Sequence, residues 1–270
     1  MHPAPITEGQ RTVTSWEMLA VFVAGISAGT INTIVGSGTL ITFPVLLATG
    51  LPPVTATVSN ALGLIPGSIS GAIGYRAELT GQRRRVLRLS VAALIGGLAG
   101  AGLLLTLPST AFETIVPVLV TVALVLVILQ PRLARSVQAR RARKGTSARP
   151  NGGPLLFTGL LLASVYGGYF TAAQGIIYLS LMGMLLDDTL QRLNAVKNIL
   201  AAVVNTVAAL FFLFVAEFDW TAVVLIAVGS AIGGQLGAKA GRKLPPAALR
   251  GLVVAVGVVA IVQLLVRRYG

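Results

Sequence analysis

The sequence predicts an all-α, polytopic integral membrane protein built from two inverted-topology repeats. Three features predict this class: the composition, the placement of the charges and an internal repeat. The 270 residues are 55% hydrophobic and only 11% charged, whereas soluble proteins average about a quarter charged residues. The net charge of +13 would suit a nucleic-acid-binding domain, but such a domain does not carry repeated apolar runs of membrane-crossing length.

The apolar segments form two sets of five. A hydrocarbon core of about 30 Å needs about 20 helical residues, so the last three segments of each set are full spans, and the first two are ambiguous. The first set is 16–35, 39–49, 54–75, 86–107 and 111–130, and the second is 154–170, 171–186, 190–216, 220–238 and 246–266. We therefore expect a polar N-terminal tail (1–15), a first transmembrane repeat (16–130), a linker (131–153) and a second repeat (154–270).

Basic residues mark three of the connecting stretches. Five lie in 76–88, seven in 131–150 and four in 239–250, which together account for sixteen of the 21 Lys and Arg residues. By the positive-inside rule these stretches face the cytoplasm, so 131–150 is expected to be a cytoplasmic linker of a multi-pass protein in the inner cell membrane. A lipid or nucleic-acid patch is the alternative for this stretch, but a solvated linker is the simpler interpretation.

A shift of 137 residues aligns the chain with itself. It places 94–108 over 231–245 with seven identities in fifteen positions, and it places the basic stretch 76–88 over 213–225, which has two acids and no base. Equivalent loops of opposite charge lie on opposite sides of a membrane, as in the inverted repeats of secondary transporters. Inversion needs an odd number of crossings between equivalent points. Each repeat is therefore expected to hold a broken or re-entrant helix pair followed by three transmembrane helices.

Each helix pair has a turn rich in glycine and small polar residues. The first turn contains Asn32, Gly36-Ser37-Gly38 and Thr39, and the second contains Thr171, Gln174 and Gly175. Backbone groups freed at membrane depth are tolerated only where they are buried in protein or line a wet cavity. If new half-helices begin at Thr39 and Ile176, two positive helix ends face one region and favour an anion. The alternative is that these glycines only allow close helix packing.

The helix after each pair carries the remaining polarity within the membrane. In the first repeat this includes Asn60, and in the second Asn194, Lys197 and Asn198 share one helical face. A lysine inside a span is costly and indicates a function by default. The alternative is that its long side chain reaches the cytoplasmic surface beside Arg192.

The sequence thus predicts a substrate-binding site around the two turns. Its candidate residues are Asn32, Ser37, Gly38, Thr39, Asn60, Gln174, Gly175, Asn194, Lys197 and Asn198. The chain has no cysteine, and its single histidine is His2. No metal site, cofactor or catalytic residue is therefore expected. Asp187 and Asp188 fit either helix capping or proton coupling.

A pattern of small and polar residues runs through 29–75. It comprises Asn32, Gly36-Ser37-Gly38, Pro44-Val45-Leu46-Leu47, Gly50, Pro52, Ala56, Ser59-Asn60 and Gly74-Tyr75. In these residues the chain resembles the sulfite exporter TauE/SafE family of membrane transporters, and 194–198 with Asn205 is similar to the corresponding helix of the second half. The resemblance implies an inner-membrane permease that exports sulfite, sulfoacetate or related organosulfur anions. Ser37 and Thr39 stand where the family has a longer glycine run.

We expect a secondary transporter that moves small organosulfur or carboxylate anions across the lipid bilayer by alternating access. Proton coupling, sodium coupling and a homo-oligomer are each compatible with the sequence, and nucleic acid is not an expected partner. The alternative is a non-transporting membrane accessory or assembly subunit, which would show no flux and would co-purify with a complex. An intramembrane enzyme built on Ser37 is disfavoured, because a nucleophile needs a general base within hydrogen-bond reach.

Overall fold

The computed structural model describes residues 14–144 and 151–240, together with Gly251, Val254, Ala255, Val258 and Val262 near the C-terminus. The N-terminal tail lies outside these residues except at its last two positions. So do most of the last expected span, 246–266, and most of the basic stretch 239–250. Regular secondary structure in the described part is helical throughout. The prediction of an all-α protein is confirmed.

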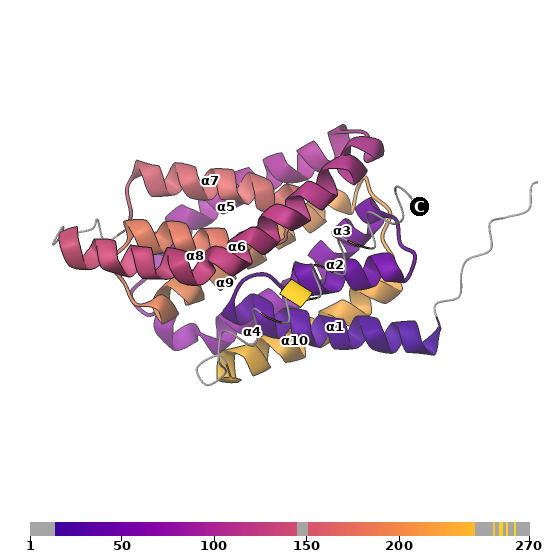
Figure 1. Cartoon of the computed structure of the whole chain (residues 1–270), viewed down its shortest axis with the longest axis horizontal. Coiled ribbons are helices and arrows are strands. Elements are labelled where there is room, and N and C mark those ends of the chain that lie inside the picture. The colour runs from indigo at the N-terminus through magenta and orange to yellow at the C-terminus, as the bar shows by residue number, and fades with distance from the viewer. Residues whose placement is uncertain are drawn as a thin grey trace, which may run out of the picture.

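In the residues that the structure describes, the first half holds six α-helices and a short 3₁₀ helix, and the second half holds four α-helices. Figure 1 shows their arrangement. The elements of the first half are α1 (Ser15–Ile34), α2 (Thr39–Ala48), α3 (Pro53–Gly63), α4 (Ile65–Gly74), η1 (Arg76–Leu79), α5 (Arg83–Thr106) and α6 (Ser109–Lys144). Those of the second are α7 (Pro154–Tyr169), α8 (Gln174–Leu185), α9 (Leu190–Phe212) and α10 (Trp220–Ala240). By length and composition, α1, α5, α9 and α10 are able to cross a membrane.

Two of the apolar helices are too short to cross a membrane. Helix α2 has 10 residues and α8 has 12, which at 1.5 Å per residue gives about 15 to 18 Å, about half of the hydrocarbon thickness. Each follows a longer apolar helix after a short break. The pairs α1–α2 and α7–α8 therefore each combine a long arm with an arm of half the membrane depth.

The span expected at 54–75 is interrupted. It forms two helices, α3 and α4, that meet at Leu64. The cause is Pro66, which has no N–H to donate to the preceding turn and clashes with a continuous helix. The second-half counterpart, α9, contains no proline and is one helix of 23 residues. Helix α6 differs too, because it continues to Lys144 through the first part of the expected linker 131–153.

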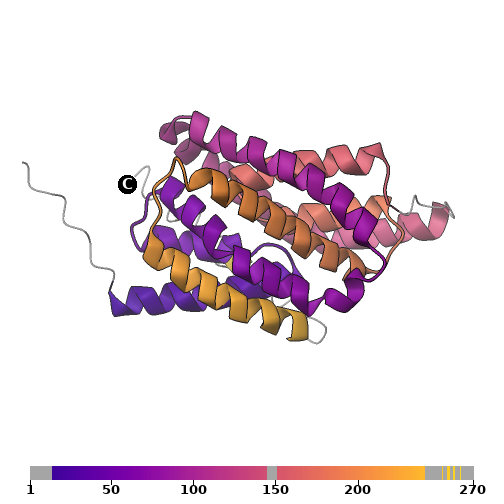
Figure 2. The same ribbon diagram turned by 180° about the vertical axis from the view of Figure 1, so that it is seen from behind.

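Helices from opposite halves form the most extensive contacts. Helix α1 lies along α10 at one edge of the bundle, and α5 lies along α7 at the opposite edge (Figure 1). Helix α9 lies between α5 and α4, as the view from behind shows (Figure 2), and it packs against both of them and against α8. The two halves are therefore interlocked by their packing.

Glycines bring these helices together. A Cβ on Gly234 of α10 would lie 2.5 Å from the Gly67 carbonyl oxygen of α4, and one on Gly97 of α5 would lie 3.4 Å from the Cα of Val204 in α9. Small residues allow such close backbone approach between membrane helices. Gly97 and Gly234 are 137 positions apart, and so are Gly67 and Val204, so the two contacts are equivalent under the repeat.

Two pairs of helix starts share the same spacing. Pro53 at the start of α3 and Leu190 at the start of α9 are 137 residues apart, as are Arg83 of α5 and Trp220 of α10. The helix contacts correspond as well. Helices α1 and α7 occupy equivalent positions in the two halves, as do α5 and α10, and α1 packs on α10 as α7 packs on α5. These correspondences support the two-repeat organisation. The inversion of one repeat relative to the other stays a prediction.

The outer faces of the edge helices are apolar. On α5, Val91 and Ile95 are about half exposed, and on α10 so are Val224 and Val228. Contiguous apolar patches of this kind are uncommon on soluble monomers. These exposed apolar faces agree with a membrane protein, whose outer surface contacts lipid.

Candidate substrate site

Both helix pairs are broken at short turns, the first at Gly36-Ser37-Gly38 and the second at 170–173. Helix α1 ends at Ile34, Gly36 has a φ of +90°, and α2 begins at Thr39 after Gly38. In the second pair Ala173 takes a left-handed conformation with φ of 57°, and α8 begins directly after it. Its first residue is Gln174, two positions before the expected Ile176.

The two breaks touch each other. The backbone N–H of Gly175 donates to the Gly36 carbonyl oxygen at 3.1 Å, and a Cβ on Gly36 would lie 2.5 Å from the Gly175 Cα. Phe170 of the second break also packs edge-on against Phe43 of α2, with ring centroids 5.3 Å apart. The N-termini of α2 and α8 therefore meet at one buried place. The first N–H groups of each helix have no partner within the helix, and the Gly36 carbonyl satisfies one of them.

A buried hydroxyl–amide cluster lies at this meeting point. We define it as Thr39 and Thr42 of α2, Asn60 of α3 and Thr171 of the second break, all of them buried. The two hydroxyls of Thr39 and Thr171 are 2.9 Å apart, and the Asn60 amide donates to them at 3.1 and 3.5 Å. The Thr42 hydroxyl donates to the side-chain oxygen Oδ1 of Asn60. The cluster therefore joins elements of both halves through polar side chains.

Thr42 and Thr171 are not among the candidates that the sequence suggested. Both lie close to signals that were available there. Thr42 lies one helical turn after Thr39 on the same face, and Thr171 belongs to the polar turn itself.

Lys197 is buried at the end of α1. The residue is 1% exposed, and its Nζ donates to the backbone carbonyl oxygens of Asn32 and Thr33 at 2.6 and 3.0 Å. The Asn194 amide also donates to the Thr33 carbonyl oxygen, at 2.9 Å. Carbonyls in the last turn of a helix lack partners within the helix, and they form its negative end. The lysine therefore does not extend to the cytoplasmic surface.

Four buried polar atoms near these elements have no hydrogen-bond partner in the described part of the chain. They are Ser37 Oγ, Asn194 Oδ1, Asn198 Nδ2 and Asn205 Oδ1. Native proteins leave few such groups unpaired, and those that remain call for a water, an ion or a functional role. Asn205 lies on the α9 face that carries Asn194 and Asn198, although it is not among the candidates from the sequence.

Two candidate side chains are engaged elsewhere. The Gln174 amide donates to the Tyr178 hydroxyl at 2.5 Å, and that hydroxyl is 2.6 Å from the Ser164 hydroxyl. Its amide therefore points toward α7 and away from the hydroxyl–amide cluster. The Asn32 side-chain amide donates to the Ser68 hydroxyl at 3.3 Å. Asn32 therefore contributes to the site through its backbone carbonyl, which accepts from Lys197. Gly38 contributes close packing, since a Cβ there would overlap the Ala28 carbonyl oxygen.

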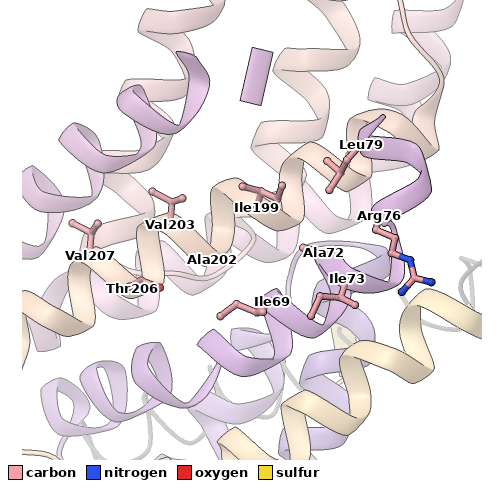
Figure 3. Close-up of a pocket in the computed structure, with 10 residues that line it drawn as sticks. All are labelled: Ile69, Ala72, Ile73, Arg76, Leu79, Ile199, Ala202, Val203, Thr206 and Val207. Carbon is pink, nitrogen blue, oxygen red and sulfur yellow. The ribbon is translucent and has the colours of Figure 1, made fainter. Parts of the chain in front are cut away.

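A separate groove of about 500 Å³ runs between α4 and α9 (Figure 3). Apolar side chains such as Ile69, Ile73, Val203 and Val207 line it, and Arg76 lies at one end. Small anions need several hydrogen-bond donors along a site, whereas Arg76 and Thr206 are the only polar side chains among the lining residues of this groove. The groove is therefore not the substrate site that the two breaks suggest.

The loop before α9 is held by an ion-pair network. Asp188 binds Arg85 of α5 at 2.5 Å and Arg192 of α9 at 2.8 Å. Burial alone would raise the pKa of Asp188, but the Arg85 hydrogen bond, the Thr189 backbone and the charge of Arg192 together hold that pKa below its ordinary value. The helix cap is the neighbouring Thr189, whose hydroxyl accepts from the Arg192 backbone N–H at 3.4 Å.

Apolar spans arranged around paired, touching helix breaks define a multi-pass membrane transporter. Binding sites in such proteins are built from discontinuous helices whose ends supply partial charges. The comparisons with known proteins agree with this class and give the family. Residues 21–264 match the model of the sulfite exporter TauE/SafE family, and the chain belongs to that family.

Curated relatives carry transporter names. The chain is 28% identical to the probable membrane transporter protein YfcA of Escherichia coli K12 over 93% of this chain and 90% of that protein. It is 26% identical to a probable membrane transporter protein of Haemophilus influenzae, over 83% and 85% of the two chains. It is also 26% identical to the probable membrane transporter protein ORF9 of a Sinorhizobium species, over 91% of each. No solved structure matches the chain. The protein is a membrane transporter and not an enzyme.

Proposed function

We propose that the protein is a secondary carrier that exports small anions by alternating access. The substrates are sulfite, sulfoacetate or other organosulfur or carboxylate anions. The observation that carries this proposal is the contact between Gly36 and Gly175, where the N-termini of two half-length helices meet. Helix N-termini attract anions through free N–H groups and the positive end of the helix dipole.

The surrounding side chains suit a small oxyanion. Thr39 and Thr171 each offer a hydroxyl, and the buried Ser37 hydroxyl has no hydrogen-bond partner among the described residues. Such hydroxyls donate to sulfonate or carboxylate oxygens as readily as they bind one another. The Lys197 stem reaches Gly175, since a Cβ on that glycine would lie 2.9 Å from the Lys197 Cδ. A lysine side chain therefore lies beside the two helix ends.

The arrangement also suits alternating access. Each half contributes one break, and the backbones of the two breaks meet at Gly36 and Gly175, with the Phe43–Phe170 ring contact beside them. If the halves are inverted repeats in the inner membrane, with the basic loops in the cytoplasm, movement of one half against the other opens the site to each side in turn.

Flux through purified protein in liposomes tests the function. We expect protein-dependent uptake of radiolabelled sulfite or sulfoacetate, measured against protein-free liposomes. Thr171→Val removes one donor from the cluster and should lower the flux. Thr121→Val is the matched control, because Thr121 is exposed on α6 and its hydroxyl bonds only its own helix.

Two results would contradict the proposal at different levels. Absence of protein-dependent flux for sulfite, sulfoacetate and simple carboxylates would refute anion transport. Equal flux in Thr171→Val and Thr121→Val would refute the placement of the site at the cluster.

A further inference from the structure

We propose that Lys197 is a built-in cation, whose ammonium fills a cation site at the C-terminal end of α1, so that the carrier works without sodium. The site itself is argued from geometry alone. Its consequence for transport rests on the proposed function.

The site has the chemistry of an alkali-cation site. Asn32 and Thr33 present backbone carbonyl oxygens 2.6 and 3.0 Å from Nζ, and α1 stops at Ile34, directly after them. Secondary transporters commonly bind their coupling cation with carbonyls of this kind, at the C-terminal ends of interrupted helices. In this chain an ammonium group takes that position and is tethered to α9.

No carboxylate neutralises the ammonium among the described residues. The acidic groups on the elements that pack against α9 are Glu17 of α1 and Glu78 of η1. Glu17 caps the opposite end of α1, where it binds Thr14. Glu78 belongs to η1, which lies beside the start of α9. The Gln82 side-chain amide donates both to the Glu78 backbone carbonyl oxygen and to that of Arg192, which lies more than one helical turn before Lys197.

Two further ionisable groups near α9 are engaged with other partners. Asp188 binds both Arg85 and Arg192. Tyr178 of α8 is bound by Ser164 and Gln174. The ammonium is therefore balanced by helix-end carbonyls, which carry only partial charge.

This balance explains how one lysine serves both the helix and the substrate. The carbonyls of α1 hold the ammonium in place, and the Lys197 Cδ, two bonds from the charged nitrogen, lies next to Gly175 in the first turn of α8. An anion at the break would complete the neutralisation. By linkage, a cation that improves anion binding is itself held more tightly when the anion is bound.

The experiment replaces the tethered ammonium with a free one. In proteoliposomes containing the full chain, we expect wild-type sulfite flux to be equal with sodium, potassium or choline as the main cation. Lys197→Ala should lower the flux at least about tenfold, which corresponds to about 1.4 kcal/mol. Methylammonium should restore flux in Lys197→Ala, because the vacated space can admit it. Lys197→Met fills that space with an uncharged chain and should not respond.

A second measurement needs no transport. Methylammonium should raise the melting temperature of detergent-solubilised Lys197→Ala by about 3 °C, the shift that roughly 1 kcal/mol of ligand stabilisation produces. It should leave wild type and Lys197→Met unchanged. Selective stabilisation of Lys197→Ala in a protein that moves no anion would support the cation site and refute the proposed function.

Two outcomes would overturn the proposal. One is wild-type flux that requires sodium, a test that depends on no variant. The other is a folded Lys197→Ala protein in which methylammonium changes neither flux nor melting temperature.

Discussion

The contact between Gly36 and Gly175 makes a quantitative prediction for Gly36→Ala. The residue has a φ of +90°, and a left-handed conformation costs an L-residue about 1 to 2 kcal/mol. The new methyl group would also lie 2.5 Å from the Gly175 Cα. Because that atom is backbone, no side-chain rotation relieves the overlap, and overpacking of this kind costs about 1 to 3 kcal/mol. The expected total is about 2 to 5 kcal/mol.

Gly81→Ala is the matched control. Gly81 also has a positive φ, +78°, but a Cβ there would meet nothing within 4 Å. It should therefore lose only the backbone term of about 1 to 2 kcal/mol. Thermal unfolding in detergent measures both, and each kcal/mol corresponds to about 2 to 4 °C in a chain of comparable size. Equal losses of melting temperature in the two variants would show that the breaks do not touch.

Three further predictions concern the cluster, the ion pairs and the topology. Asn60→Ala removes the amide that joins three threonine hydroxyls; flux in proteoliposomes should fall about tenfold or more, the effect of about 1.4 kcal/mol, and wild-type flux would refute a role for the cluster. Asp188→Asn should lower stability by about 1.5 to 3 kcal/mol, since it weakens hydrogen bonds to charged groups. Because the folded-state pKa of Asp188 is lowered, its contribution to stability is fully present above the ordinary pKa of 3.8 and is lost as pH falls through the lower folded-state pKa. If the melting temperatures of wild type and Asp188→Asn fell in parallel over this acid range, this role of Asp188 would be contradicted. For topology, a membrane-impermeant maleimide applied to intact cells should label Glu217→Cys and spare Thr80→Cys. Labelling of both or of neither would rule out the inverted arrangement, and the reverse pattern would rule out the cytoplasmic placement of the basic loops.

Much of the fold follows from hydropathy and turn residues. The segments expected to begin at Leu190 and Trp220 correspond to α9 and α10, which begin at those residues. The break after α1 is predicted from Gly36-Ser37-Gly38, because glycine is a weak helix former that readily takes a positive φ. The interruption at Leu64 was harder to foresee, since proline inside a span is compatible with a kink as well as with a full break.

The site was predictable only in part, because sequence patterns report side chains and not backbone partners. Lys197 stands out as a charge within a span, but its partners are carbonyls of α1, which no residue type encodes. The early start of α8 has a similar origin, since it depends on the left-handed backbone of Ala173. The threonines of the cluster look unremarkable in sequence until the two breaks are brought together in space.

The packing of α1 against α10 affects the order in which the protein assembles during synthesis. The Thr30 hydroxyl of α1 bonds the Gly233 carbonyl oxygen of α10 across 203 residues of chain. At about 5 to 20 residues per second, roughly 10 to 40 s separate the emergence of these two helices from the ribosome. During that interval the glycine-containing face of α1 has no native partner and must be covered by lipid, by another helix or by the insertion machinery. Native assembly of this transporter is therefore completed late, after most of the chain has entered the bilayer.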